Sequence, residues 1–299
     1  MKKVLLLFST VLLFACSNEN NNQNSEEAFN NATNLINRSL SHFEEFSKEA
    51  LINFDFETIG IEHNLGLEYI YSEIYLNQVE LKYYSISEQE SFIRNSVQYY
   101  MGNSYYKDDI SPSNLSTLLS STNLSDDLSN KIDPSELNLY SLNAINSYDS
   151  IFTNLDEFTE NESFDVSEYK IKARNLEHNL KNDLNEDLIT KDEYFTLRTM
   201  IVVSVYSLEY WDSNLINWNN IYNSETLAKG NNWYHIKRGA VAMGKADLLS
   251  AGVGLVFGGV YGFFTGGPAG ALLGAASTAV GMGMNGSAVA GFKYIYDNS

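Results

Sequence analysis

The sequence predicts an all-α fold: an irregular multi-helix bundle with a C-terminal glycine-rich helical hairpin. Three observations indicate this fold. Apolar residues recur at helical spacing along most of the chain. Several of these runs begin with helix-capping residues. The chain has only three prolines, and none interrupts a long periodic run. No convincing run of alternating apolar and polar residues, which would indicate a strand, interrupts the series.

The periodic runs and their caps predict the individual helices. The first helix is expected to begin after Asn24 as N-cap, and the third at Ser87, where Glu90 completes a capping box. Asp133 followed by Pro134 marks another start. The Ser/Asn-rich region 103–132 is expected to form short turns and loops. The expected helices cover 25–51, 57–77, 87–102, 133–158, 166–184 and 190–222.

The N-terminus has the features of an export signal. Lys2 and Lys3 precede an apolar run, Val4 to Phe14, which is too short to cross a bilayer as a helix. The run ends at Leu13-Phe14-Ala15-Cys16, which resembles the lipobox of bacterial lipoproteins. The resemblance implies cleavage before Cys16 and acylation there, so that the protein contacts membrane lipid through this residue. Phe14 is bulkier than the residue that the lipobox usually has at that position.

Cysteine usage and the next residues fit the same interpretation. Cys16 is the only cysteine, which excludes a disulfide within the chain. Ser17 is not the aspartate that retains lipoproteins at the inner membrane in the best-known sorting rule. The expected location is therefore the cell envelope, at the outer rather than the inner membrane. The alternative is an ordinary secreted protein with an incidental cysteine.

These features divide the chain into five parts. The charge balance of the whole is strongly acidic, with 38 Asp and Glu against 19 Lys and Arg and a formal net charge of −19. An acidic chain does not bind nucleic acid or anionic lipid by electrostatics. The expected parts are a signal peptide (1–15), the acylated cysteine with an Asn-rich tether (16–24), an acidic helical body (25–228), a basic linker (229–247) and a glycine-zipper hairpin with its tail (248–299).

The hairpin is predicted from an uncharged run, Leu248 to Phe292, which holds thirteen of the nineteen glycines. Glycines at intervals of four put small residues on one helix face, where two backbones can approach closely. The turn is expected at Gly266-Gly267-Pro268, between arms of residues 248–264 and 269–292. The helix-packing glycines are Gly254, Gly258, Gly262, Gly266, Gly270 and Gly274.

The sequence does not decide whether lipid or the protein's own core surrounds the hairpin. The first arm is hydrophobic enough to insert as a transmembrane helix, and we expect lipid contact slightly ahead of burial in the protein's own core. Lys237, Arg238 and Lys245 would then serve as headgroup anchors, or else as ordinary solvated charges. The tail resembles the glycine-zipper segments of bacteriocin-like peptides and small envelope proteins, which implies membrane insertion or self-association.

Histidines supply one candidate ligand site. Gly60-Ile61-Glu62-His63-Asn64 resembles a Gly-x-x-His-Asn motif of uncharacterised exported bacterial proteins that also end in a glycine-rich tail. The word Glu-His-Asn-Leu recurs at 177–180, so His63 and His178 could face each other across the bundle. Coincidence or a structural role, such as a hydrogen bond to a neighbouring helix, is the favoured alternative. Neither histidine has the i, i+4 partner of a zinc-protease pattern.

A second candidate site is aromatic. Trp211, Trp218 and Trp233 lie near the junction of body and tail. They predict a packed aromatic core or, alternatively, a stacking platform for a glycan or peptide.

Catalytic motifs do not emerge from the sequence. It contains no Gly-x-Ser-x-Gly elbow, no phosphate loop and no EF-hand spacing. We therefore expect no catalytic residue, no metal and no cofactor. The leading hypothesis is a non-catalytic, lipid-anchored envelope protein with a membrane-associated hairpin. The alternatives are a bacteriocin-like antagonism factor that inserts into membranes and a surface protein that binds glycans or peptides.

Overall fold

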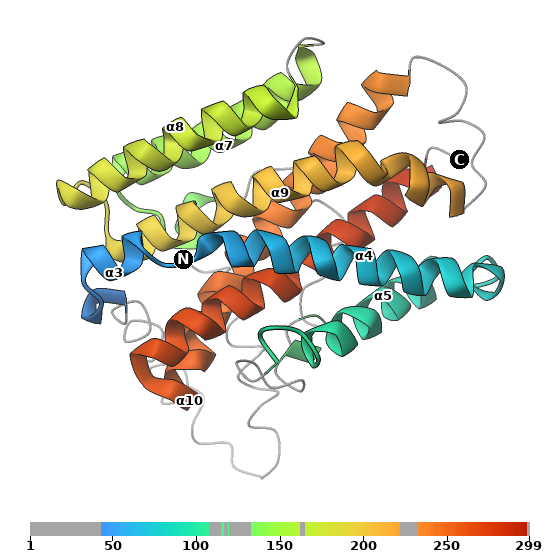
Figure 1. Cartoon of the computed structure of the whole chain (residues 1–299), viewed down its shortest axis with the longest axis horizontal. Coiled ribbons are helices and arrows are strands. Elements are labelled where there is room, and N and C mark those ends of the chain that lie inside the picture. Colours follow the sequence, from blue (N-terminus) through green and yellow to red (C-terminus); the bar gives the residue numbers. More distant parts are fainter. Residues whose placement is uncertain are drawn as a thin grey trace, which may run out of the picture.

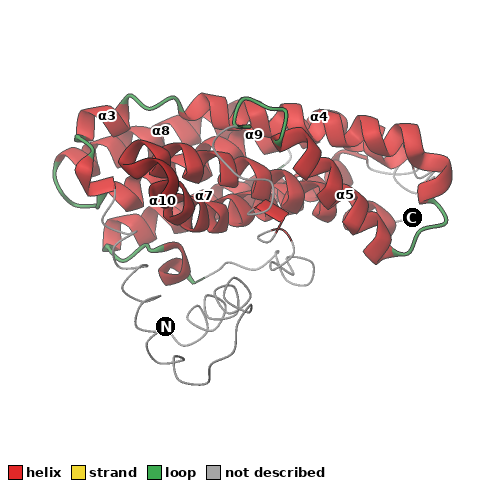
Figure 2. Cartoon of the chain, turned by 90° about the horizontal axis from the view of Figure 1, so that it is seen from below, coloured by secondary structure: helices red, strands yellow, loops and turns green. Residues whose placement is uncertain are grey.

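The described part of the chain folds into a bundle of α-helices. The computed structural model describes residues 43–107, 115–116, 119, 133–161, 165–221 and 232–297, and these form seven α-helices and no strand (Figures 1 and 2). Two short 3-10 helices complete the described elements. The elements are η1 (Phe43–Glu45), α3 (Lys48–Ile52), α4 (Phe56–Leu81), α5 (Ile86–Met101), η2 (Pro134–Leu137), α7 (Leu142–Glu160), α8 (Val166–Asn185), α9 (Lys191–Ile221) and α10 (Asn232–Asp297).

Helix α9 is the axis of the bundle. It packs against α4, α7, α8 and α10, and in Figure 1 it runs between α8 on one side and α4 on the other, with α10 behind it. Nineteen of its side chains are buried, including those of Trp211 and Trp218. A helix that is apolar on almost every side is expected where neighbours surround it.

Helix α10 folds back on itself, which confirms the predicted hairpin. A Cβ added at Gly254 would lie 2.7 Å from the carbonyl oxygen of Thr278, and one at Gly258 would lie 2.3 Å from that of Gly274. In a straight helix Gly254 and Thr278 would be about 36 Å apart. Both pairs are centred on residue 266, within the predicted turn, and Figure 1 shows the orange arm returning as the red arm.

The two arms of the hairpin are packed in the core of the bundle. Leu248, Leu249, Ala251, Ala275 and Ala279 are completely buried. The arms contact α4, α5, α7 and α9 of the same chain. The expectation that lipid contact outranks burial therefore does not hold for the described side chains of the arms. Among the described residues, no helix is long and apolar enough to cross a membrane.

The expected basic linker belongs to α10 from Asn232 onward. The Lys245 ammonium bonds the Asp156 carboxylate at 2.5 Å, and Lys237 donates to the Asn161 carbonyl at 3.2 Å. The Lys237 ammonium also lies 4.8 Å from the centre of the Phe158 ring. These two lysines are held by α7 and the residue after it, rather than presented as headgroup anchors.

Helix starts show where sequence prediction was right. Helix α4 begins after Asp55, whose carboxylate accepts from the Thr58 amide at 3.3 Å. Asp165 caps α8, which begins at the predicted residue 166. At the start of α9, Thr190 and Glu193 bond each other's backbone N–H groups, which is the reciprocal pattern of a capping box.

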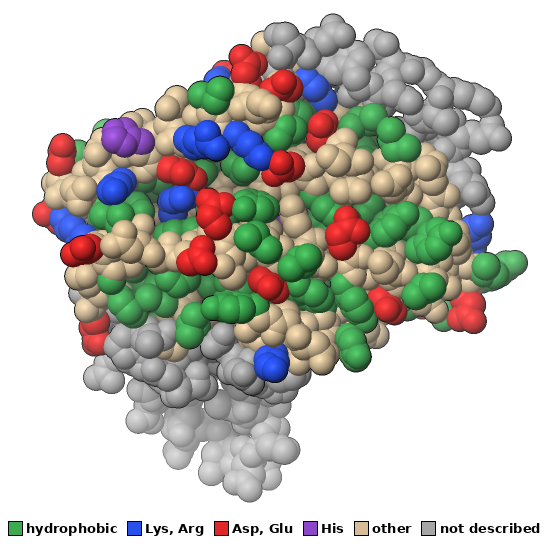
Figure 3. Space-filling model, in the orientation of Figure 1, with side chains coloured by type: hydrophobic (Ala, Val, Ile, Leu, Met, Phe, Trp, Pro, Cys, Tyr) green, Lys and Arg blue, Asp and Glu red, His purple; other side chains and the backbone are tan. Residues whose placement is uncertain are grey.

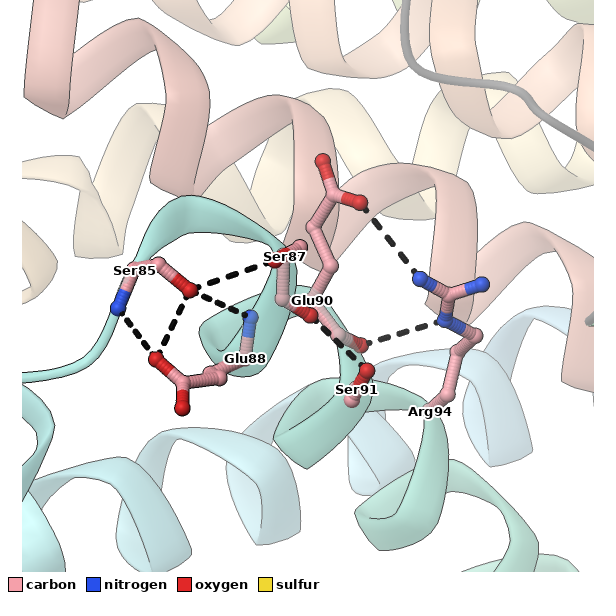
Figure 4. A network of polar contacts seen from close by, with 6 residues as sticks. All are labelled: Ser85, Ser87, Glu88, Glu90, Ser91 and Arg94. Carbon is pink, nitrogen blue, oxygen red and sulfur yellow. Dashed lines mark hydrogen bonds and ion pairs between the residues drawn. The ribbon is translucent and has the colours of Figure 1, made fainter.

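One helix start was predicted at the wrong residue. The capping box of α5 joins Ser85 to Glu88, two residues before the predicted Ser87 and Glu90 (Figure 4). The sequence Ser-Ile-Ser-Glu-Gln-Glu contains both spacings, so the pattern alone does not choose between them. The helix ends at Gly102, as predicted.

Two predicted helices are broken. The helix expected over 133–158 begins as η2 and stops at Asn138, which has a left-handed φ of 58°. Ser141 then caps a new helix, α7, by accepting from the Ala144 amide. The helix expected over 25–51 lies mainly outside the described residues, and its C-terminal part is interrupted by the extended Ser47, which caps α3.

Glu193 holds the break between η2 and α7 against α9. Its carboxylate accepts from the backbone amides of Tyr140 at 2.7 Å, Ser141 at 2.6 Å and Thr190 at 2.8 Å. Burial acts to raise the pKa of this carboxyl, but the amide donors outweigh burial and lower the pKa. One buried side chain thus satisfies three backbone donors that the irregular turns leave without helical partners.

Candidate functional site

The candidate site is a buried polar cluster where the hairpin meets α4 and α9. His63 lies on α4 and Asp247 on the first arm of α10, and both side chains are completely buried. The Nε2 atom of His63 is 3.3 Å from Oδ2 of Asp247. A Cβ added at Gly283, on the second arm, would lie 3.2 Å from Cδ2 of His63. A glycine there gives the imidazole room between α4 and the hairpin.

A chain of hydrogen bonds extends from this pair to α9. The Ser287 hydroxyl, on the second arm, donates to Oδ2 of Asp247 at 2.8 Å. The Trp211 indole N–H donates to the same hydroxyl at 2.6 Å. Ser287 is therefore both donor and acceptor, and it links the two arms to each other and to α9. These bonds are formed at fully buried side chains, where losing a partner is costly.

The contact at Nδ1 of the His63 imidazole shows where one of the ring's protons lies. The Asn64 amide nitrogen donates to the Tyr206 carbonyl oxygen at 3.0 Å, so the amide oxygen is the atom that faces His63 Nδ1, at 2.9 Å. That oxygen can only accept, hence Nδ1 carries a proton. A neutral imidazole with a proton on Nδ1 presents a lone pair at Nε2.

A proton between Nε2 of His63 and Oδ2 of Asp247 would relieve a repulsion that their positions otherwise create. A lone pair on Nε2 facing an ionised carboxylate at 3.3 Å would be repulsive in a completely buried place. Complete burial raises the pKa of the Asp247 carboxyl, and His63, Ser207 and Ser287 act in the opposite direction. His63 and Asp247 thus form a buried pair in which the pKa of the carboxyl is raised.

The structure brings together some of the residues that the sequence singled out. His63, Asn64 and Trp211 belong to the cluster. Trp218 lies beside it, with its ring centre 5.0 Å from that of Trp211 and its indole N–H donating to the Tyr210 hydroxyl at 3.0 Å. Both tryptophans are completely buried, so they form a packed aromatic core and not a stacking platform for a glycan.

Other predicted site residues lie elsewhere. His178 is exposed on α8 and bonds Asn182 at 3.2 Å. His63 is completely buried against α10, so the two histidines do not form the suggested paired site. Cys16 and the side chain of Trp233 are outside the described part of the chain.

The glycines that the sequence selected pack one arm of the hairpin on the other. Gly254 and Gly258 face backbone and side-chain atoms of Thr278 and the backbone of Gly274. This small face is used within the chain, so a second copy would have to bind through other surfaces. The side-chain surroundings of Gly262 and Gly266 lie outside the described part of the chain.

Sequence reasoning missed the partners of His63. Asp247, the last residue of the expected basic linker (229–247), lies inside α10 and is completely buried. One signal could have found it, because Asp247 is the last charged residue before the uncharged run. A charge that enters an apolar segment needs a buried partner, and His63 is one of only four histidines.

The chemistry of the cluster is that of a structural link between helices. Among the residues that the structure describes, no group of three or more His, Cys, Asp or Glu side chains is arranged to hold a metal ion. The cluster connects α4, α9 and both arms of α10 through named hydrogen bonds and one histidine–aspartate contact. Comparisons with protein-family models, curated protein sequences and solved structures found no match for this chain.

Proposed function

We propose that the chain is an exported, lipid-anchored protein of the cell envelope whose helical body acts by binding or packing rather than by catalysis. The single observation that carries the proposal is the position of Cys16, the only cysteine, directly after an apolar run behind two lysines. Acyl chains at that residue would attach the protein to the membrane without help from the C-terminal hairpin. Ser17 favours the outer membrane as the location.

The position of the hairpin supports an anchor at the N-terminal end. Most described side chains of both arms are buried within the bundle, and the polar cluster joins the arms to α4 and α9. A hairpin engaged in this way cannot at the same time hold the protein in a bilayer. We infer that attachment depends on Cys16 and that the hairpin serves the body as a core element.

The test compares the natural chain with Cys16→Ala in membrane fractions of the producing cells. We expect the natural chain to incorporate an acyl label and to resist carbonate extraction, whereas Cys16→Ala loses the label and is extracted. Sucrose-gradient separation of the two membranes then checks the outer-membrane location. Retention of Cys16→Ala in carbonate-washed membranes would contradict the proposal and indicate a second membrane element.

A second candidate function is insertion of the hairpin into a target bilayer, as an antagonism factor would do. The observation that favours it is the imperfect polar packing of an otherwise uncharged hairpin. The Ser250 hydroxyl and the Asn285 amide oxygen are buried without a hydrogen-bond partner among the described residues. Each such group costs about 1–3 kcal/mol, which lowers the free energy needed to release the hairpin.

Release of a dye from vesicles tests this second function with the whole Cys16→Ala chain. Insertion predicts release that Gly258→Ala reduces, because an added Cβ would separate the two arms. Gly244→Ala is the matched control, since a Cβ there would meet only atoms at ordinary contact distance. The absence of release at every lipid composition tried would exclude this function.

A further inference from the structure

A groove lined by charged side chains lies between α4, α8 and α9, away from the buried cluster. Its volume is about 250 Å³. It lies on the face shown in Figure 3, where acidic and basic side chains gather over α8 and α9. Neighbouring opposite charges on a helical surface commonly form ion pairs, but here charged side chains also line a groove.

Three glutamates in the lining each accept a hydrogen bond at one carboxylate oxygen. Oε2 of Glu57 accepts from the Tyr206 hydroxyl at 2.8 Å, and Oε1 of Glu209 accepts from the Lys170 ammonium at 2.6 Å. Oε1 of Glu177 accepts from the Arg198 guanidinium. Among the described residues, the second oxygen of each carboxylate has no hydrogen-bond donor. Three acceptors on three helices match the three N–H groups of an ammonium ion.

The groove also has a cation without a partner. Arg174 lies on α8, is exposed, and forms no hydrogen bond or ion pair with any residue that the structure describes. Its charge acts on Glu177, but its N–H groups are left for a ligand. A guanidinium binds a carboxylate through two parallel hydrogen bonds. The lining therefore offers sites for both charges of a zwitterion.

Size and polarity limit the ligand further. Ala173, Val202 and Val205 form the apolar part of the lining. A volume of about 250 Å³ lies below the range of about 300–1,000 Å³ that holds drug-sized ligands. A compact molecule with a short hydrocarbon side chain fits this combination better than a sugar chain does.

The electrostatic state of Glu177 is consistent with a cationic ligand. Burial raises the pKa of its carboxyl, Arg198 lowers it, and the neighbouring Glu57 raises it again. Burial and the second carboxylate thus disfavour the ionised form when the groove is empty. An ammonium group between these carboxylates would favour the ionised form.

We propose that this groove binds a small amino acid with an apolar side chain, its ammonium group at Glu57, Glu177 and Glu209 and its carboxylate at Arg174. This inference goes beyond the proposed function, because anchoring at Cys16 neither requires nor predicts a ligand. It concerns residues outside the buried cluster and does not depend on whether the hairpin ever leaves the core.

Calorimetric titration of the full chain carrying Cys16→Ser tests the proposal with three probes of the same shape. L-leucine carries both charges, 3-methylbutylamine lacks the carboxylate, and 4-methylpentanoate lacks the ammonium group. We expect saturable binding of L-leucine, weaker binding of the amine and the weakest binding of the acid. The loss of one charge-assisted contact corresponds to about tenfold or more in Kd.

Variants assign the two halves of the site. Glu177→Gln is expected to lower the affinity for L-leucine by about tenfold, because a neutral amide does not attract the ammonium charge as a carboxylate does. Arg174→Ala is expected to lower the affinity for L-leucine to that for 3-methylbutylamine. The affinity for 3-methylbutylamine itself is expected to stay unchanged. Glu90→Gln is the matched control, since Glu90 forms a similar ion pair with Arg94 on α5, outside the groove (Figure 4). Circular dichroism verifies that each variant is folded.

Three results would overturn the proposal. The first is no saturable binding of L-leucine to the folded chain. The second is equal affinity for L-leucine and 3-methylbutylamine, which would remove the role of Arg174. The third is an affinity that Glu177→Gln and Glu57→Gln leave at the value of the Glu90→Gln control. Each result is independent of the membrane fractionation that tests the lipid anchor.

Discussion

The buried contact between His63 and Asp247 links the hairpin to α4 at the level of single residues. Asn64 fixes one proton on Nδ1 of the imidazole, so a proton at Nε2 would be a second one. Removal of that proton would leave a carboxylate and a lone pair facing each other where both side chains are completely buried. An uncompensated buried charge is among the most destabilising features that a protein interior can contain.

The pH dependence of stability follows from this pair. Because the pKa of Asp247 is raised in the folded state, the folded chain binds more protons than the unfolded chain above the ordinary carboxyl value of 3.8. The free energy of unfolding therefore falls as the pH rises from that value through the folded-state pKa. In Asp247→Asn the amide can donate to His63 Nε2 without holding an extra proton. We expect urea unfolding across pH 4–8 to show a flatter decline for Asp247→Asn; an identical slope would contradict this assignment.

The residues of the cluster were only partly predictable from sequence. His63 and Asn64 attracted attention as a short motif, and Trp211 as part of an aromatic group. Their partners Ser287 and Asp247 are far away in the chain, and Ser287 lies in a segment rich in small residues where nothing distinguishes it. The close approach of these residues is set by the packing of α10 against α4 and α9, which no local pattern contains.

At the scale of elements, the start of α5 distinguishes two capping schemes. The Ser85 hydroxyl accepts from the Glu88 amide, while the Ser87 hydroxyl lies 3.2 Å from that of Ser85 (Figure 4). Ser85→Ala is expected to cost about 1 kcal/mol because it removes the N-cap acceptor. Ser87→Ala should change stability by less than about 0.5 kcal/mol. Thermal unfolding measures both, and the reverse order would place the cap where the sequence alone put it.

The glycines of the hairpin make a second prediction for an element. A Cβ at Gly258 would lie 2.3 Å from a backbone oxygen of the opposite arm, so Gly258→Ala should destabilise the protein by about 1–3 kcal/mol even though alanine favours helices. At Gly244 the nearest atoms would be 3.8 Å away, and Gly244→Ala should gain up to about 1 kcal/mol. Chemical unfolding of the two variants gives the comparison. A stabilising Gly258→Ala would mean that the arms do not touch.

Helices were more predictable than their interruptions. Asp165 and Thr190, each followed by an acidic residue at the third position, gave the starts of α8 and α9 correctly. Asn138 and Ser47 broke two predicted helices, because a left-handed residue or a new N-cap leaves the apolar periodicity almost unchanged. At the first break, Glu193, from a distant part of the chain, satisfies the freed amides of Tyr140 and Ser141.

For the whole molecule, the location of the hairpin is the feature that changes the interpretation most. The sequence predicts the two arms and the turn, because glycine spacing and the Gly-Gly-Pro turn are local signals. It does not predict what surrounds them, since an uncharged surface suits lipid and a protein core equally well. The helices α4, α5, α7 and α9 decide the matter by providing the apolar surroundings within the same chain.

Two neighbouring positions on the second arm test this account directly. Leu273 is 37 % exposed, whereas Ala276, less than one turn further along, is 0 % exposed. Each is replaced by cysteine in a chain carrying Cys16→Ser, which has no other thiol. Maleimide labelling in buffer without lipid or detergent is then followed over time. We predict that Leu273→Cys reacts rapidly and that Ala276→Cys reacts only after unfolding in urea; equally rapid labelling of both would contradict a hairpin packed in the core of its own bundle.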